Sequence, residues 1–423
     1  MSQPVVIVLA GGASHRFWPL RDKPLVRLGS QTLIERHLRA LRDLGCERFV
    51  VVVRPETVEA LSELSRSLDA EVALAVQDEA LGMANAVLAA RPALERFGDA
   101  SVYVTQAQDI VEQRLHRELL GAWEHREGSL AGLIAAVRVE GYFPGGYLKL
   151  AGERVTGVVE KPGYGNTPSD LVNLVAHVYA SSWELLGALE AEERVPGADD
   201  AYERALTRLM TAGEFRAHVY DGRWQALKYP WHLLDVMDML LELWTAGSES
   251  PGAEYEQNED GVFLGRGVRI FPGAYVVAPA LIDHEVVIGH NALVRGSIVG
   301  AKSVVGFGSE IARSLLVDSV ELHHNYVGDS VFDRGSSMGY GAVTANFRLD
   351  GRTVPSMVRD ERLDSERMKL GLILGAGARI GVNASTMPGV KIGPSAIVGP
   401  NLKVTRDVPD GARVLDEEAY GRF

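Results

Sequence analysis

Short apolar runs alternate with longer amphipathic stretches over residues 1–245. The runs are rich in Val, Leu and Ala, and they are Val5–Leu9, Arg48–Val53, Ala73–Val76 and Ser101–Thr105. Apolar residues recur at helical spacing in Thr32–Leu44, Thr57–Leu68, Gly82–Arg91 and 231–245. Alternating strands and helices are typical of right-handed crossovers over a parallel sheet. We therefore predict an α/β domain with a mostly parallel sheet, whose strand carboxyl ends offer a binding crevice.

From residue 262 the apolar positions repeat every six residues. One series comprises Leu264, Ile270, Val276, Ile282, Ile288 and Val294, and it resumes after a one-residue slip at Val299, Val305, Ile311 and Val317. It returns at Leu374, Ile380, Ile392 and Val398, with Thr386 in the remaining place. A six-residue repeat fits neither a helix nor a simple alternating strand. It predicts a left-handed parallel β-helix with stacked aliphatic side chains inside.

These patterns divide the chain into four parts. An α/β domain covers residues 1–245, a small polar linker covers 246–257, the β-helix covers 258–408, and a tail covers 409–423. The charged segment Arg348–Lys369 interrupts the six-residue repeat. It is either an extended loop that leaves the β-helix or a mobile excursion.

Composition excludes several classes of protein. The chain has 423 residues and one cysteine, Cys46, which excludes an intrachain disulfide framework and a cysteine-based zinc cluster. The net charge of −13 argues against a nucleic-acid or anionic-membrane surface as partner. No apolar run reaches 18 residues, and the N-terminus reads as a buried strand rather than a signal peptide. We expect a cytoplasmic protein.

A glycine-rich loop follows the first predicted strand. The sequence VIVLAGGASHRFWPLRDK brings Gly11 and Gly12 directly after the apolar run and places Arg16 and Lys23 downstream. Glycines let backbone N–H groups approach phosphate oxygens, which Arg and Lys side chains neutralise. The loop matches neither a GxGxxG nor a Walker A motif. A purely structural turn and a phosphate site both explain it.

At this loop the sequence resembles the sugar-1-phosphate nucleotidylyltransferases. Their signature is L-A-G-G-x-G-T-R followed by P-K, with the Lys seven residues after the Arg. The residues that match are Leu9, Ala10, Gly11, Gly12, Arg16 and Lys23. The resemblance implies a Rossmann-like nucleotidyltransferase domain in which the loop and Arg16 hold the triphosphate and Lys23 contacts phosphate. Ser14, His15 and Asp22 depart from the signature.

Further positions match the same family in order along the chain. Gln77 and Gly82 match the segment that reads the nucleobase, although Met83 replaces a common Thr or Ser. Asp109, in VTQAQDIV, matches the carboxylate that holds Mg²⁺. The resemblance implies that the sugar phosphate is bound by Gly146, Glu160, Lys161 and Asn173. Without the resemblance, Glu160 and Lys161 are better explained as a solvated charged turn than as a binding site.

One departure concerns the metal. The family supplies a second carboxylate in a W-x-D-x-G-[TY]-P-like segment, but Ala226 stands at that Asp and His232 stands where an Asp often follows Pro-Trp. The loss of a Mg²⁺ ligand weakens the clamp on an in-line displacement. Lys228 supplies positive charge in place of part of the metal, as a hypothesis. The alternative is a domain that binds nucleotide sugars but turns them over poorly.

The β-helix carries a second motif. Residues Ser319–Asn346 resemble the acetyltransferase site of the bifunctional N-acetylglucosamine-1-phosphate uridylyltransferase/glucosamine-1-phosphate acetyltransferase family, and the archaeal type above all. The match implies that His323 takes a proton from a sugar amine while Tyr326, Asn346 and Arg295 hold sugar and phosphate. By itself, His323 reads as an ordinary surface histidine.

The same stretch departs from the family at three places. Ala312, next to Arg313, replaces a Lys, Tyr340 replaces a small residue, and Ser337 replaces an Asn. Residues Lys369–Val398 resemble the coil that binds coenzyme A, which makes acetyl-CoA a co-substrate if this site is active. The family's β-helices form trimers with sites between subunits, so a homotrimer is implied.

Three functions remain open on the sequence alone. The first is transfer of a nucleotidyl group from UTP or dTTP to a hexose or N-acetylhexosamine 1-phosphate, with or without N-acetylation. The second is an acyltransferase alone, and the third is a non-catalytic or regulatory protein that binds nucleotide sugars. The substitutions at His15, Ala226 and Ala312 motivate the last two.

Overall fold

In a computed structural model, which describes residues 3–12, 14–126, 128–193 and 200–416, the chain divides into two units. The first comprises Met1–Ala13 and Ile34–Trp224, and the second comprises Ser14–Leu33 and Gln225–Phe423. Residues 14–33, here called the N-terminal arm, thus group with the β-helix although they follow the glycine loop in sequence.

The first unit is built on a nine-stranded sheet of order β5-β4-β1-β6-β11-β8-β12-β10-β9. Its strands are β1 (Val5–Leu9), β4 (Arg48–Val53), β5 (Glu71–Val76), β6 (Val102–Gln106), β8 (Leu130–Arg138), β9 (Gly146–Ala151), β10 (Arg154–Glu160), β11 (Leu171–Tyr179) and β12 (Glu214–Tyr220). The short strands β7 (Asp109–Val111) and β13 (Trp224–Ala226) lie outside this sheet. The predicted α/β fold is confirmed.

Parallel pairing joins β5, β4, β1 and β6, and also β8 with β12. Antiparallel pairing joins β11 to β6 and β8, and β10 to β12 and β9. The parallel strands are apolar along their length because helices cover both faces, so a period of two is absent there. The alternation of strands and helices in the sequence does not predict the antiparallel half of the sheet.

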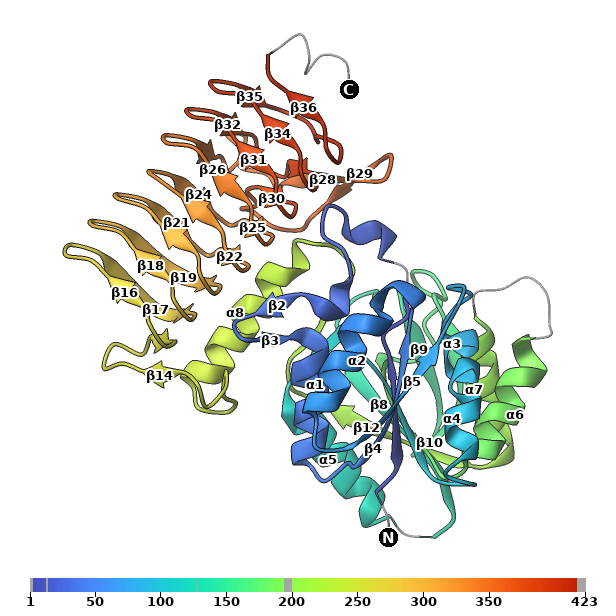
Figure 1. Cartoon of the computed structure of the whole chain (residues 1–423). Helices are drawn as coiled ribbons and strands as arrows, with labels where there is room; N and C mark the ends of the chain where they lie inside the picture. Colours follow the sequence, from blue (N-terminus) through green and yellow to red (C-terminus); the bar gives the residue numbers. More distant parts are fainter. Residues whose placement is uncertain (1–2, 13, 127, 194–199, 417–423) are drawn as a thin grey trace. The chain divides into compact units, whose positions relative to one another are not determined.

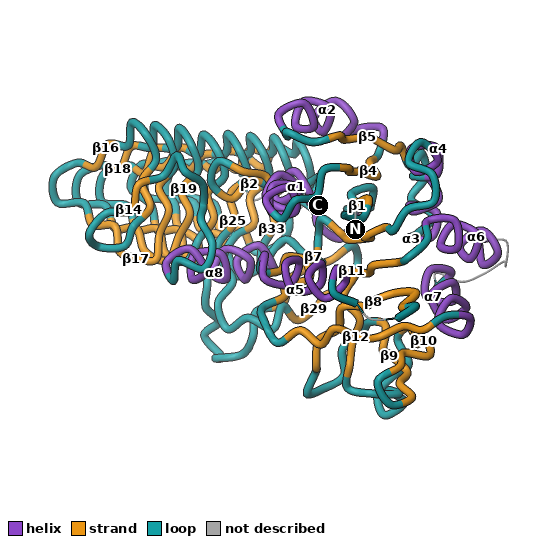
Figure 2. Tube along the Cα trace, turned by 90° about the horizontal axis from the view of Figure 1, so that it is seen from below, coloured by secondary structure: helices purple, strands orange, loops and turns teal. Residues whose placement is uncertain are grey.

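Helices cover both faces of this sheet (Figure 2). They are α1 (Leu33–Asp43), α2 (Val58–Ser67), α3 (Met83–Ala89), α4 (Arg91–Glu95), α5 (Gln113–Glu124), α6 (Ser182–Glu193) and α7 (Ala201–Ala212), with a 3-10 turn, η3 (Pro55–Thr57). Helices α3, α6 and α7 pack together on one face, and α1 and α5 lie on the other. The core between sheet and helices includes Ile7, Val52, Val104, Leu185 and Leu206, all buried.

The second unit contains a parallel β-helix (Figure 1). Its strands are β14 (Glu256–Gln257), β15 (Phe263–Leu264), β16 (Arg269–Ile270), β17 (Tyr275–Ile282), β18 (Val287–Ile288), β19 (Leu293–Val299), β20 (Val304–Val305), β21 (Glu310–Ala312), β22 (Leu315–Leu316), β23 (Glu321–Leu322), β24 (Tyr326–Gly328), β25 (Val331–Phe332), β26 (Ser337–Met338), β27 (Val343–Thr344), β30 (Ile373–Leu374), β31 (Arg379–Ile380), β32 (Ser385–Thr386), β33 (Lys391–Ile392), β34 (Ile397–Val398), β35 (Lys403–Val404) and β36 (Arg413–Val414). Equivalent strands of successive coils pair in parallel register, as between Ile288 and Val305.

Most of the six-residue series points into the β-helix, with three corrections. Ile270 is 43% exposed and lies outside the core. Ile282, Ile288, Val294, Val305 and Ile311 are fully buried in its core. At the next position the core takes Leu316 rather than the predicted Val317, because Val299 pairs with Leu316. Strand β36 pairs with β34, so the coils continue past the predicted end at residue 408.

Three further elements belong to the second unit. Helix α8 (His232–Thr245) packs against β17, β19 and β22. The interruption of the repeat contains an antiparallel hairpin, β28 (Pro355–Val358) and β29 (Glu361–Asp364), which replaces the open choice between loop and excursion. The N-terminal arm holds η1 (His15–Phe17), η2 (Lys23–Leu25) and the hairpin of β2 (Arg27–Leu28) and β3 (Gln31–Thr32). Among the described residues, no helix is both long and apolar enough to cross a bilayer.

The packing of the β-helix interior predicts the cost of a cavity. Phe332 is fully buried there, so Phe332→Ala removes a ring whose space the rigid coils cannot refill. We expect a loss of about 3–5 kcal/mol in the free energy of unfolding. Val304→Ala trims a side chain that is 37% exposed on the same β-helix, and it should change stability by under about 0.5 kcal/mol. Urea denaturation followed by circular dichroism measures both, and equal effects would contradict a close-packed interior.

Candidate active sites

The glycine turn lies at the carboxyl end of β1. The backbone here is fixed by Ala10, whose N–H donates to the Val52 carbonyl at 2.9 Å, and by Leu9, whose carbonyl accepts from the Ala107 N–H at 3.1 Å. A Cβ atom on Gly11 would lie 2.8 Å from Oε1 of Gln77, so any other residue at this place would force the Gln77 amide to move. Gly12 is exposed, so its backbone faces open space. The structure thus brings the predicted Leu9, Ala10, Gly11, Gly12 and Gln77 together.

Gln77 is 4% exposed and braces the loop before α3. Its Nε2 donates to the Gly82 carbonyl at 3.2 Å and to Oδ1 of Asn85 at 3.0 Å. Gly82 has φ +101°, which a side chain would strain. The amide nitrogen of Gln77 therefore holds the predicted base-reading loop in shape. The role of Asn85 was missed from the sequence, although it stands three residues after Gly82 in the first turn of α3.

Two glutamines that the sequence reasoning passed over continue from the end of β6. Nε2 of Gln108 donates to Oε1 of Gln106 at 3.0 Å, and Nε2 of Gln106 lies 3.1 Å from the sulfur of Met83. Their spacing of two residues at a strand end was the available signal. They form an uncharged polar chain between the glycine turn and the loop that carries Met83.

Asp109 begins β7 and is half-buried. Nε1 of Trp224 lies 3.5 Å from its Oδ1, at the limit of a hydrogen bond. Within the described residues, no group of three or more His, Cys, Asp or Glu side chains is placed to hold a metal ion. Mg²⁺ commonly binds through one or two carboxylates together with substrate phosphates. A single carboxylate such as Asp109 fits that pattern and does not form a complete protein cage.

Gly146, Glu160 and Asn173 come together from three neighbouring strands. Gly146 pairs with Glu160 between β9 and β10, and β11 also pairs with β9. A Cβ atom on Gly146 would lie 2.5 Å from Oδ1 of Asn173 and 3.2 Å from Oε2 of Glu160. Nζ of Lys161 lies 3.0 Å from Oε1 of Glu160. The cluster offers hydrogen-bonding groups suited to hydroxyls, with an ammonium group beside them for an anion.

Arg16 and Lys23 belong to the N-terminal arm and hence to the second unit. Arg16 is exposed, and Nζ of Lys23 lies 5.4 Å from the ring centre of Phe17. The pKa of His232 is lowered to about 4, mainly by burial and also by the charges of Lys228 and Lys23, while the hydrogen bond to the Ala226 backbone and the charge of Glu366 oppose the shift. Lys23, Lys228 and His232 are therefore neighbours within this unit.

His232 does not replace the expected carboxylate. Its Nδ1 lies 2.8 Å from the Ala226 carbonyl oxygen and 3.2 Å from the Lys228 backbone nitrogen, so backbone groups already occupy this ring nitrogen. With a pKa of about 4 the ring is uncharged at neutral pH. The position therefore supplies neither a negative charge nor a free metal-binding nitrogen at Nδ1.

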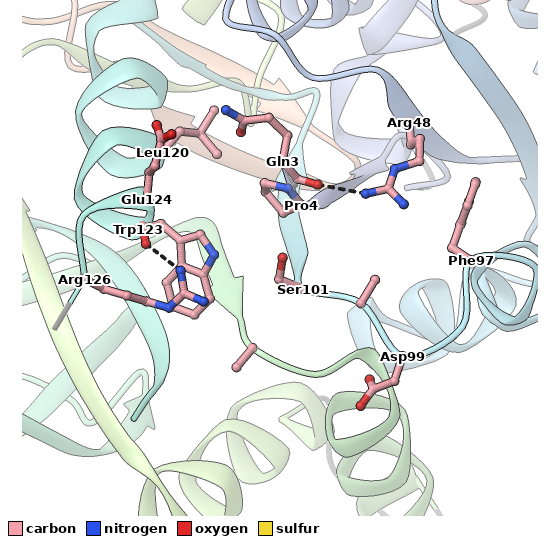
Figure 3. Close-up of a pocket in the computed structure, with 12 residues that line it drawn as sticks. Gln3, Pro4, Arg48, Phe97, Asp99, Ser101, Leu120, Trp123, Glu124 and Arg126 are labelled. Atoms are coloured by element: carbon pink, nitrogen blue, oxygen red, sulfur yellow. Dashed lines mark hydrogen bonds between the residues drawn. The ribbon is translucent and has the colours of Figure 1, made fainter. Parts of the chain in front are cut away.

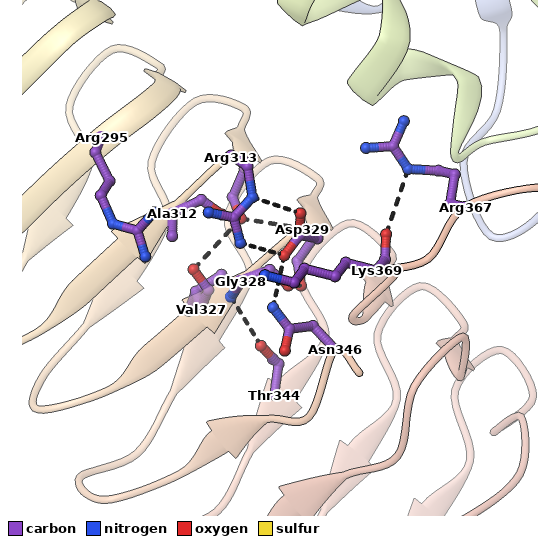
Figure 4. Close-up of polar contacts among 12 residues, drawn as sticks. Arg295, Ala312, Arg313, Val327, Gly328, Asp329, Thr344, Asn346, Arg367 and Lys369 are labelled. Atoms are coloured by element: carbon purple, nitrogen blue, oxygen red, sulfur yellow. Dashed lines mark hydrogen bonds and ion pairs between the residues drawn. The ribbon is translucent and has the colours of Figure 1, made fainter. Parts of the chain in front are cut away.

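The β-helix motif forms a network around Asp329 (Figure 4). Arg313 donates two hydrogen bonds to this carboxylate, at 2.7 and 2.6 Å, although Asp329 is only 2% exposed. Nδ2 of Asn346 donates to Oδ2 of Asp329 at 2.6 Å and to the Tyr326 hydroxyl at 3.1 Å. The structure thus brings Tyr326 and Asn346, two of the residues named from the family motif, within hydrogen-bond distance. It adds Arg313 and Asp329, which the sequence signalled only by the Gly-Asp pair and by the residue next to Ala312.

Gly328 makes room for this network. A Cβ atom there would lie 2.6 Å from both Nδ2 of Asn346 and the Tyr326 hydroxyl. The Gly328 N–H donates to the Thr344 hydroxyl at 3.0 Å, which ties this coil to the next. Arg295 stands apart in the close-up, since its guanidinium donates to Oε1 of Glu310 at 2.7 Å. A phosphate bound by Arg295 therefore competes with Glu310.

His323 is exposed on the outside of the β-helix. Its backbone N–H donates to Oδ1 of Asn325 at 2.7 Å, but its ring makes no hydrogen bond to any described residue. The next residue, His324, stacks with Phe307 and Tyr340 at ring distances of 5.9 and 5.1 Å. The chain by itself does not orient His323 as a base.

A separate cavity of about 440 Å³ lies in the first unit near the amino ends of β1 and β6 (Figure 3). Pro4 and Ser101, which precede these strands, line it together with Arg48, Trp123 and Arg126. Ligands of open parallel sheets bind at the carboxyl ends of the strands, where Gly11 lies. None of the predicted site residues lines this cavity.

Helix α8 carries two carboxylates, Asp235 and Asp238, that interact with Arg367, which follows the β28–β29 hairpin. Asp235 forms an ion pair with Arg367. Burial raises the pKa of Asp238 to about 6, Arg367 opposes this shift, and Asp235, Glu242 and Asp329 add to it. Asp238 is thus a half-buried acid of α8 that senses the charge of Asp329.

Comparison with known proteins agrees with this geometry. A family model for the MobA-like NTP transferase domain matches residues 6–246. The chain is 26% identical over 412 residues to a bifunctional sugar-1-phosphate nucleotidylyltransferase/acetyltransferase of Sulfurisphaera tokodaii, covering 96% of this chain and 98% of that protein. It is 25% identical to the bifunctional protein GlmU of Methanococcus maripaludis, covering 97% of each chain. The same protein of Paenarthrobacter aurescens is 25% identical and is covered to 88%. The predicted family resemblance is confirmed.

The pKa of Asp238 predicts how stability depends on pH. An acid whose pKa is raised in the folded state binds more protons there than in the unfolded chain, so stability falls as pH rises from about 4 to about 6. Asp238→Asn should therefore stabilise the protein at pH 7 by about 1–2 kcal/mol, after an allowance for screening by water, and should have no such effect at pH 4. Thermal unfolding at the two pH values measures this. Asp260→Asn, at an exposed turn, is the control, and an equal effect at both pH values would refute the assignment.

Proposed function

Because the chain belongs to the MobA-like NTP transferase family, we propose that it transfers a nucleotidyl group from an NTP to a sugar 1-phosphate. The observation that carries the proposal is the convergence of Gly146, Glu160 and Asn173 within a few ångströms. A carboxylate and an amide at the edge of a bare glycine suit a ring with several hydroxyls. The near full-length similarity to a sugar-1-phosphate nucleotidylyltransferase/acetyltransferase supports the same substrate class.

The reaction is an in-line substitution at phosphorus. An oxygen of the sugar phosphate forms a bond to the α-phosphorus of the NTP, and the bond from that phosphorus to the bridging oxygen of the β-phosphate breaks. Pyrophosphate leaves with the electron pair of the broken bond. Catalysis of such a step consists mainly of positioning and neutralisation of charge.

Each proposed residue has one part in that step. Backbone N–H groups of the glycine turn approach phosphate oxygens. Gly12 is exposed and has no side chain that would hold the nucleotide away, while Gly11 leaves the room that Gln77 fills. Arg16 and Lys23 neutralise the triphosphate and the leaving pyrophosphate. On the sugar side, Glu160 and Asn173 bind hydroxyls and Lys161 meets the phosphate. Gln77 and Gly82 shape the loop against which the base lies.

Mg²⁺ fits the single carboxylate of Asp109 when phosphates complete its coordination. When bound, it neutralises charge that develops on the phosphate oxygens. The second carboxylate of the family is absent, since Ala226 and the neutral His232 occupy its places. We propose that Lys228, next to Lys23 in the second unit, supplies part of the missing positive charge.

The nucleotide and sugar are proposed from similarity alone. UTP with N-acetylglucosamine 1-phosphate is the first pair, because the β-helix resembles that of the bifunctional family. dTTP with glucose 1-phosphate is the second. Met83, which replaces a common polar residue, makes no distinction between these bases.

A second activity is supported by the network around Asp329. Tyr326 and Asn346 are held together by a hydrogen bond of 3.1 Å and offer a sugar-binding surface next to Arg313. In the proposed step, a sugar amine attacks the thioester carbonyl of acetyl-CoA, the carbon–sulfur bond breaks, and His323 takes the amine proton. The proposal includes a homotrimer assembled through the β-helix, in which a neighbouring subunit supplies a partner for the His323 ring.

Asp109→Asn tests the nucleotidyl transfer. Because a metal clamp is worth several kcal/mol in the transition state, pyrophosphate release should fall by about 100-fold or more. The assay uses UTP and dTTP, Mg²⁺ and a panel of sugar 1-phosphates. Asp43→Asn, an exposed residue at the end of α1, is the matched control and should retain full activity. Full activity of Asp109→Asn would remove Asp109 from the site.

His323→Ala tests the acetyl transfer. Loss of a general base should lower the release of coenzyme A thiol by about 10²–10⁴-fold and leave pyrophosphate release intact. His290→Ala, another exposed β-helix histidine, is the control. If the parent protein releases thiol but no pyrophosphate, the chain is an acyltransferase alone. If it binds nucleotide sugars and forms neither product, it is a non-catalytic binder.

A further inference from the structure

The N-terminal arm is fastened to the β-helix at three places along its length. The attachments lie at Trp18 and Arg21, at Arg27, and at Ser30. All of their partners belong to the second unit, so the arm and the coils form one body. Arg16 and Lys23, the two cations assigned to the triphosphate, lie on this arm.

The first attachment reaches the last coil. Nε1 of Trp18 donates to Oδ1 of Asp410 at 2.6 Å, and the Arg21 guanidinium donates to Oδ2 at 2.8 Å. Asp410 stands between β35 and β36. One carboxylate thus accepts from both sides of the turn that separates Arg16 from Lys23.

Lys391 also contacts Trp18, next to the hydrogen bond between Trp18 and Asp410. Its Nζ lies 4.9 Å from the ring centre of Trp18 and 3.5 Å from Oδ2 of Asp407, and it donates to the Met357 carbonyl. The residue is only 3% exposed, so its charge is largely removed from water and its attraction to the indole ring is strengthened. Lys391 therefore joins the arm, the β28–β29 hairpin and the β33 coil at one point.

The other two attachments hold the hairpin of the arm. Nε of Arg27 lies 3.2 Å from Oδ2 of Asp318. The Ser30 N–H donates to the Tyr255 hydroxyl at 2.7 Å, and this hydroxyl in turn donates to the fully buried Asp283 at 2.8 Å. The arm is thus fixed both before and after Lys23.

We propose that Asp410 and Lys391 are positioning residues that set the placement of Arg16 and Lys23 for NTP binding. The inference rests on the nucleotidyl transfer proposed above. The β-helix then contributes to the nucleotidyl reaction through its last coils, separately from its own Asp329 network. A displacement of about 1 Å at a group that binds the reacting phosphates is enough to cost a large factor in rate.

Two variants test the proposal from opposite sides of the contact. Asp410→Ala removes the acceptor, and Trp18→Phe removes the Nε1 donor while it leaves every β-helix residue unchanged. Each should raise the KM for UTP or dTTP by about 10-fold with a smaller change in kcat. Each should also speed hydrogen exchange of the backbone amides in residues 14–33, measured by mass spectrometry. Asp260→Ala, an exposed carboxylate at the start of the β-helix, is the control and should alter neither.

Thiol release at the β-helix and the thermal unfolding midpoint separate positioning from general damage. Both should stay at the parent level, and Asp410→Asn, which retains one acceptor oxygen for Trp18, should recover part of the NTP affinity. Unchanged exchange in residues 14–33, or an unchanged KM despite faster exchange, would overturn the proposal. Absence of pyrophosphate release in the parent protein would refute the nucleotidyl transfer instead. In that case the exchange data and titration calorimetry with UTP still decide whether Asp410 places the arm for nucleotide binding.

Discussion

A missing Cβ atom makes three polar clusters of this protein possible. At Gly11 the absent atom leaves room for the amide oxygen of Gln77, at Gly146 for that of Asn173, and at Gly328 for the amide nitrogen of Asn346. In each case a Cβ would lie between 2.5 and 2.8 Å from the amide atom, so the amide would have to move. The same steric rule therefore operates in an α/β sheet and in a β-helix. It brings a neutral hydrogen-bonding group against bare backbone where a polar ligand is expected.

Several charged residues of the family pattern are replaced by uncharged residues in this chain. Where two carboxylates are expected around a metal, this chain has Asp109 alone, and the places of the second hold Ala226 and an uncharged His232. Lys228 and Lys23 lie close enough to His232 to affect its pKa. In the β-helix, the cation missing at Ala312 has a neighbour in Arg313, but that guanidinium is bound to the buried Asp329. Within the second unit, Lys228 lies two residues after Ala226, and Arg313 lies directly after Ala312.

Local patterns predicted the elements well where a strand is buried along its whole length. Val5–Leu9 and Arg48–Val53 match β1 and β4 at both ends, because a strand covered on two faces is apolar along its whole length. The six-residue period gave the β-helix, but it failed at Val317, where a shorter step puts Leu316 inside. The antiparallel strands β9–β11 and the β28–β29 hairpin follow from pairing partners, which periodicity does not reveal.

Some site residues could likewise be named from sequence motifs, and others became visible only in the structure. Gly146, Glu160 and Asn173 were found from motifs, and the sheet register explains why residues so far apart in sequence meet. Asn85, Gln106 and Arg313 were missed, since amides and ion-paired cations occur everywhere in sequences and only geometry distinguishes them. The contact between Trp18 and Asp410 joins residues 392 positions apart and leaves no local trace.

That separation has a consequence for biosynthesis. A ribosome that adds about 5–20 residues per second needs roughly 20–80 s to travel from Trp18 to Asp410. Throughout this interval the N-terminal arm has no last coil to rest on, even when the sheet around β1 has already formed. The hydrogen bonds of Trp18 and Arg21 to Asp410 form only after Asp410 has been synthesised, so a chain that terminates before this residue lacks that attachment of the arm.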